Sequence, residues 1–166
     1  MPNLSAGHCL VAGALMTSPP PAVPPPCASD EAIAAIGCGL LDRTLPKEAW
    51  THAAHFAATF WLLRTRPGMD LPREMPDLIR AYNLALGGEN TDTSGYHETI
   101  TQASIRAARA ILAEDPSRPL WATCDALMTS PFGRSDWLLT YWTRPVLFSV
   151  AARRGWCAPD IRDLPF

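Results

Sequence analysis

The sequence predicts an all-α protein, a compact bundle of about five to six helices behind a disordered, proline-rich N-terminal leader. From residue 30 onward, Ala, Leu and Arg recur at helical rather than alternating spacing, and ten prolines separate segments of helix length. Residues 1–29 hold the other seven of the 17 prolines and no Asp, Glu, Lys or Arg. We therefore divide the chain into a leader, residues 1–29, and a single helical domain, residues 30–166.

The first three expected helices have recognisable start or stop signals. The first covers residues 30–43, with Ser29 or Asp30 as its N-cap. The second covers residues 46–65, because proline suits the first helical position and Arg66-Pro67-Gly68 stops the helix. The third covers residues 72–86, and the Gly87-Gly88 pair that follows favours the left-handed conformation that closes many helices.

The second half of the chain continues the helical pattern after a polar loop at residues 89–95. A fourth helix is expected over residues 96–114 and a fifth over residues 117–128. Further helical material at residues 136–154 is interrupted near Arg144-Pro145, because proline lacks the backbone N–H that an interior position needs. An extended tail, residues 158–166, completes the predicted domain.

Charge and hydrophobicity exclude two classes of partner. The chain has 14 Lys and Arg against 16 Asp and Glu, a formal net charge of −2, and no basic run. This balance argues against nucleic acids and anionic membrane surfaces as partners. No uninterrupted apolar stretch reaches the roughly 18 residues that a membrane span needs. We expect a cytoplasmic protein that acts on a small-molecule substrate, and a homodimer is compatible with the sequence.

Cysteine usage also indicates a cytosolic protein. The five cysteines are odd in number and include no C-x-x-C pair. We therefore expect reduced, mostly structural thiols in a cytosolic protein, with neither a disulfide framework nor a zinc finger.

Two polar stripes on otherwise apolar helices are the strongest functional signal. The second helix is apolar almost all the way round, which predicts a buried, central helix, yet Glu48, His52, His55 and Thr59 form one stripe along it. The fourth helix carries a matching stripe of His97, Thr101 and Ser104. Burying such groups without partners costs about 1–3 kcal/mol each, so the two stripes are expected to face each other.

Facing stripes would bring His52, His55 and His97 together. Three imidazoles with an open fourth position are the ligand set of catalytic zinc, so a divalent metal ion, zinc first, is the expected cofactor. Glu48 would either orient His52 or join as a fourth ligand, and an added carboxylate shifts the preference toward iron or manganese. The alternative is that each histidine is a core residue that is only hydrogen-bonded.

The segment from Asn90 to Thr99 is rich in small polar groups where the fourth helix begins. Free backbone N–H groups at a helix start suit a substrate's anionic end, so Asn90 and Thr91 are candidate substrate-binding residues. Glu98 is a candidate catalytic base, although its position also suits a helix cap, and Tyr96 is a candidate proton donor. The further substrate-binding candidates on the third and fourth helices are Tyr82, Asn83 and Thr101.

These features predict a metal-dependent enzyme of the hydrolase or lyase type. The metal would polarise a substrate carbonyl or activate water, while Glu98 or Glu48 moves protons. The alternative function is a non-catalytic helical module that binds a small ligand or a protein through a core whose histidines are only hydrogen-bonded.

Four segments, residues 50–55, 90–101, 147–153 and 159–166, resemble a small family of uncharacterised bacterial proteins. The shared pattern is an H-x-x-H helix, here His52 to His55, followed by the motif Gly95-Tyr96-His97-Glu98-Thr99. The resemblance covers most of residues 49–166 and excludes the leader. It implies that the two motifs belong to one site, and it implies no particular activity.

Overall fold

The computed structural model describes residues 25–166, and every helix discussed below lies in that range. Five α-helices have ten or more residues: α1 (Asp30–Asp42), α2 (His52–Thr65), α3 (Leu71–Ala85), α4 (Glu98–Glu114) and α5 (Leu120–Thr129). Two short ones follow, α6 (Arg144–Leu147) and α7 (Val150–Arg154). Single 3-10 turns occupy Lys47–Ala49, Pro131–Gly133 and Trp137–Thr140. Residues 25–166 contain no strand, which confirms the predicted all-α class.

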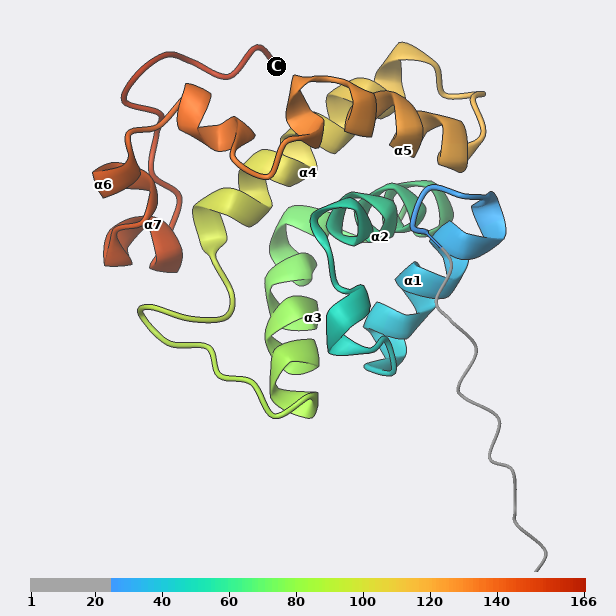
Figure 1. The fold of residues 1–166 in the computed structure, drawn as a ribbon, viewed down its shortest axis with the longest axis horizontal. Helices are drawn as coiled ribbons and strands as arrows, with labels where there is room; N and C mark the ends of the chain where they lie inside the picture. The colour runs from blue at the N-terminus through green and yellow to red at the C-terminus, as the bar shows by residue number, and fades with distance from the viewer. Residues whose placement is uncertain (1–24) are drawn as a thin grey trace, which may run out of the picture.

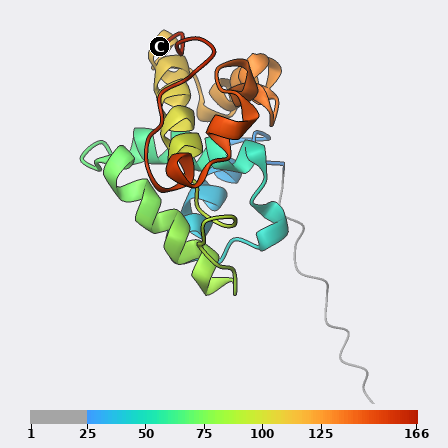
Figure 2. The same cartoon turned by 90° about the vertical axis from the view of Figure 1, so that its left-hand side faces the viewer.

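Helix α2 lies at the centre of the bundle, as its all-round apolar sequence predicts. It packs against α1, α4 and α5, while α3 packs against α1 and α4 (Figure 1). Phe56, Phe60 and Leu62 of α2 are each at most 1% exposed. The perpendicular view places the α6–α7 segment beside the N-terminal half of α4 (Figure 2), where α4 and α7 are in contact.

The helix boundaries differ from the expected ones where a side chain caps a helix later than the sequence pattern suggests. Helix α2 begins at His52 because Thr51 is extended and its Oγ1 accepts the Ala54 backbone N–H at 3.3 Å. The preceding Lys47–Ala49 turn is separate, so Glu48 does not continue the stripe of α2. Pro145 likewise lies in the first turn of α6, where its missing N–H costs nothing, and it starts a helix rather than interrupting one.

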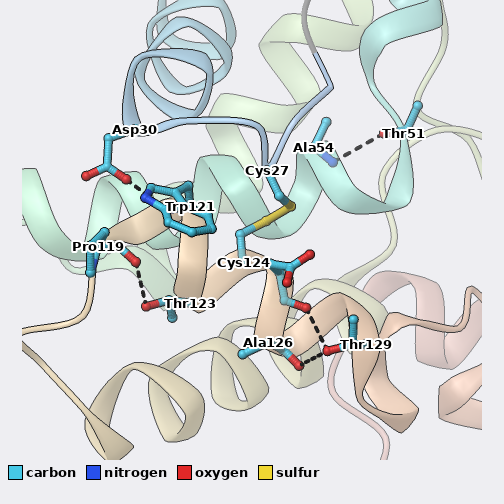
Figure 3. The surroundings of a disulfide bond; sticks show 11 residues. Cys27, Asp30, Thr51, Ala54, Pro119, Trp121, Thr123, Cys124, Ala126 and Thr129 are labelled. Carbon is cyan, nitrogen blue, oxygen red and sulfur yellow. Dashed lines mark hydrogen bonds between the residues drawn. A yellow bond between two sulfur atoms is a disulfide. The ribbon is translucent and has the colours of Figure 1, made fainter.

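A disulfide joins the segment before α1 to α5 and corrects the expectation that all five cysteines are reduced. Cys27 and Cys124 are bonded across 97 residues of sequence (Figure 3), whereas Cys38 and Cys157 are free. Next to the bond, Asp30 accepts the backbone N–H of Trp121 at 2.8 Å. The sequence carried no signal for this pair, because proximity between α1 and α5 is created by packing rather than by spacing.

The disordered leader was expected over residues 1–29, and residues 1–24 lie outside the described part of the chain. The described end of the predicted leader contains Cys27 and Ser29, and Ser29 accepts the Ala32 N–H as the N-cap of α1. Of the described helices, none has both the length and the apolar character that crossing a membrane would require.

Candidate functional site

Two cavities adjoin each other beside α2 and α4. The first has a volume of about 280 Å³ and is lined by Trp50, His55, Thr59, Met75, Ile79, Asn83, Gly95, Tyr96, His97, Ile100, Thr101, Ser104 and Ile105. The second, also about 280 Å³, is lined by His52, His55, Phe56, Ile100, Ser104, Ser135, Asp136, Trp137, Leu138, Leu139, Arg144, Leu147 and Phe148. His55, Ile100 and Ser104 belong to both linings, so the two cavities share one wall.

His55 is the polar side chain at the centre of this arrangement. Its ring stacks on Trp50 with the ring centroids 4.0 Å apart, and none of the hydrogen bonds among the described residues involves its ring nitrogens. Burial, and to a smaller extent the charge that His52 can carry, lowers the pKa of His55 from 6.5 to about 4. His55 is therefore a neutral imidazole at pH 7, with one donor and one acceptor nitrogen available beside the cavities.

His97 is fully engaged in the protein's own hydrogen bonds. It is the N-cap of α4: its Nδ1 accepts the Ile100 backbone N–H at 3.4 Å, so the proton is on Nε2, which donates to the Leu147 carbonyl at 2.9 Å. Burial, the largest cause, lowers the pKa of His97 and keeps this neutral form. In this conformation neither nitrogen offers a free lone pair.

His52 is anchored through one nitrogen, since its Nε2 lies 3.0 Å from the Phe132 carbonyl. Its ring is also perpendicular to the ring of Phe56, with the ring centroids 5.2 Å apart. In this conformation one nitrogen of His52 and both nitrogens of His97 are hydrogen-bonded, and Glu48 is exposed. Within residues 25–166 no cluster of three or more His, Cys, Asp or Glu side chains is placed to hold a metal ion. The zinc site, and its iron or manganese variants, stay predictions.

Tyr96 and Glu98 are bonded to each other at the start of α4. The Tyr96 hydroxyl donates to Glu98 Oε2 at 2.6 Å, and Gln102 donates to Glu98 Oε1 at 2.9 Å. Burial, followed by the bond to Glu98, raises the pKa of Tyr96 well above its ordinary value. Both carboxylate oxygens thus already have donors, and Glu98 is not part of either cavity lining. Catalysis by either residue would have to break this pair, and their catalytic roles stay predictions.

Asn90 organises the loop between α3 and α4. Its Oδ1 accepts from the Asn83 side chain at 2.9 Å and from the Tyr96 N–H at 3.1 Å, while its Nδ2 donates to the Arg80 carbonyl at 3.1 Å. Gly95 has φ +76°, and a Cβ there would collide with the Glu89 carbonyl, so the loop needs glycine at this point. The loop in turn places Tyr96 and His97 at the first cavity.

The other predicted substrate-binding residues divide between the cavity and its supports. Asn83 and Thr101 line the first cavity. Tyr82 is 1% exposed, and its hydroxyl donates to the Leu45 carbonyl at 3.0 Å, which ties α3 to the segment before α2. Thr91 accepts the N–H groups of Thr93 and Ser94 and so stabilises the loop. Of this group, the fold brings Asn83 and Thr101 to the first cavity beside His55.

Sequence reasoning missed the walls that come from α3 and from the C-terminal segment. Met75 and Ile79 of α3 line the first cavity, and Leu138 and Leu147 line the second. The only available signal for the second set was the density of Trp, Leu and Phe at residues 137–148, which equally fits ordinary core packing.

No protein-family model, no curated protein and no solved structure matches this chain.

Proposed function

We propose that this protein binds a small, largely apolar molecule in the first cavity, with neutral His55 as the hydrogen-bonding anchor. The observation that carries the proposal is the contrast among the three histidines: His97 and His52 bond to backbone carbonyls, while His55 faces the cavity with its ring nitrogens unpartnered. Such a cavity, mostly apolar with a few polar groups, is the usual form of a small-molecule site.

The cavity walls favour a planar or branched apolar body. Ile79, Ile100 and Ile105 supply aliphatic surface, and the indole of Trp50 supports the imidazole of His55 from one side. Stacking restricts the ring of His55, so a ligand group that meets its nitrogens gains a hydrogen bond without having to immobilise the side chain. Asn83 and Thr101 also bring polar groups to the cavity, and they offer a second point of recognition.

Indole, a neutral probe with a single N–H donor, tests the proposal. We expect an NMR titration with indole to shift the side-chain signals of His55 and Trp50. The substitution His55→Phe should weaken indole binding about tenfold, because the complex loses one hydrogen bond and the ligand N–H is left without an acceptor. His52→Phe is the matched control, because His52 lines the second cavity and not the first. Equal affinity of the wild type and His55→Phe would contradict the proposal.

Stability should also depend on pH through His55. The unfolded imidazole binds a proton near its ordinary pKa of 6.5, and the folded one only near 4, so between these values the unfolded state holds more protons. The free energy of unfolding therefore falls as the pH is lowered, by about 2 kcal/mol from this group between pH 7 and pH 5. Urea unfolding of the wild type and His55→Phe at both pH values measures the difference. A histidine titration midpoint near 6.5 for His55 would refute the premise.

The metal-dependent hydrolase or lyase remains the competing function, and metal analysis separates the two. Stoichiometric zinc in the purified protein, lost in both His55→Ala and His97→Ala, would favour the metalloenzyme. If a metal-free preparation binds indole in a His55-dependent manner, the ligand-binding function is the better account.

A further inference from the structure

The second cavity has a cationic side chain at its opening. Arg144 is exposed and also lines the cavity, which places its guanidinium near the boundary between cavity and solvent. The carbon of its guanidinium lies 5.5 Å from the centre of the Phe148 ring, and none of the ion pairs among the described residues includes Arg144. Arg153 donates hydrogen bonds to the Gly95 and Tyr96 carbonyls, whereas the Arg144 guanidinium makes no hydrogen bond to any residue in the described part of the chain.

The carboxylate beside this opening does not neutralise Arg144. Asp136 also lines the cavity, but Arg134 donates two hydrogen bonds to it, each at 2.9 Å. These bonds are the largest cause that keeps the Asp136 pKa below its ordinary value, and the charge of Arg144 is a smaller one. Two arginines and one aspartate leave the opening with a net positive charge, which favours an anionic ligand group.

Behind the opening the cavity becomes apolar. Phe56, Leu138 and Leu147 are each at most 4% exposed and belong to three different elements, α2, the Trp137–Thr140 turn and α6. At the wall shared with the first cavity, Ser104 donates its hydroxyl proton to the Ile100 carbonyl at 2.8 Å, so its oxygen is left as an acceptor. The lining thus combines the exposed Arg144 with buried apolar side chains, and His55 and Ser104 belong to the wall shared with the first cavity.

We propose that the second cavity binds a small apolar carboxylate, with the carboxylate paired to Arg144 and the apolar body packed against Phe56, Leu138 and Leu147. A planar guanidinium with free N–H groups matches a carboxylate in two parallel hydrogen bonds, which is the strongest polar contact available at this opening. The inference rests on the proposed function only for the role of His55 in the shared wall. The carboxylate specificity rests on Arg144 alone.

The test compares 3-phenylpropionate with its uncharged counterpart 3-phenylpropan-1-ol. We expect both to shift the indole N–H signal of Trp137, which lines the second cavity, and the carboxylate to bind about tenfold more tightly at low ionic strength. Arg144→Gln should remove this preference and leave the affinity for the alcohol unchanged. Arg109→Gln is the matched control, because Arg109 is an exposed arginine of α4 outside both cavities.

Three results would overturn the inference: equal affinity of acid and alcohol, a preference that survives in Arg144→Gln, or no response of Trp137 to either compound. Each is distinguishable from a failure of the proposed function, which is judged by indole binding at Trp50 and His55. The two signals come from different tryptophans, because Trp50 is absent from the lining of the second cavity and Trp137 from that of the first.

Discussion

Removing the Cys27–Cys124 disulfide with the double substitution Cys27→Ala/Cys124→Ala should lower the free energy of unfolding by about 4 kcal/mol. The bond closes a loop of 97 residues, and a cross-link over so long a loop removes much of the conformational entropy of the unfolded chain. It also ties the segment before α1 to α5, beside the hydrogen bond that the Trp121 backbone N–H donates to Asp30. Equilibrium urea unfolding, fitted to two states, measures the difference.

The free cysteines provide the control for this measurement. Cys38→Ala/Cys157→Ala replaces the same number of cysteines without removing a cross-link, so its unfolding midpoint should stay close to that of the wild type. Treatment of the wild type with a thiol reductant should reproduce the loss seen in the Cys27/Cys124 variant. If the unfolding curve is the same with and without reductant, the bond does not contribute as expected.

The substitution His97→Ala should lower the free energy of unfolding by about 4 kcal/mol at pH 7. Loss of the N-cap of α4 accounts for about 1 kcal/mol, and about 3 kcal/mol comes from leaving the buried Leu147 carbonyl without its donor and losing the ring's packing. His97→Asn keeps a side-chain acceptor at the cap, so it should recover about 1 kcal/mol of the loss. Thermal or urea unfolding of the two variants provides the measurement.

The same variants distinguish the structural role of His97 from the metal-ligating one. A structural role predicts that zinc added to the wild type leaves its stability unchanged. If zinc instead stabilises the wild type strongly and has no effect on His97→Ala, His97 acts as a ligand, and the hydrogen bonds described for it must break when metal binds.

The helical class and the central position of α2 could be predicted because both follow from local sequence. A helix with apolar residues on every side can only be stable when buried, and Phe56, Phe60 and Leu62 are buried accordingly. The helix starts were less predictable. Thr51 and His97 each end an extended segment with a side-chain cap, and a cap depends on backbone geometry that spacing alone does not reveal.

The grouping of site residues was predictable only in part. Spacing placed His52 and His55 on one helix and suggested that His97 would face them, and the first cavity does bring His55 and His97 together. The sequence could not show which histidine is hydrogen-bonded to the backbone. The Leu147 and Phe132 carbonyls that hold His97 and His52 come from segments 50 and 80 residues away.

Composition and helical periodicity were enough to predict the all-α class and the burial of α2, because both follow from local sequence. Three features come from tertiary packing instead: Cys27 meets Cys124, His55 keeps its ring nitrogens unpartnered, and Arg144 lies beside an apolar cavity. All three depend on contacts between segments far apart in the chain. Such contacts are set by how helix faces pack against one another, and the order of residues within a single helix does not encode that arrangement.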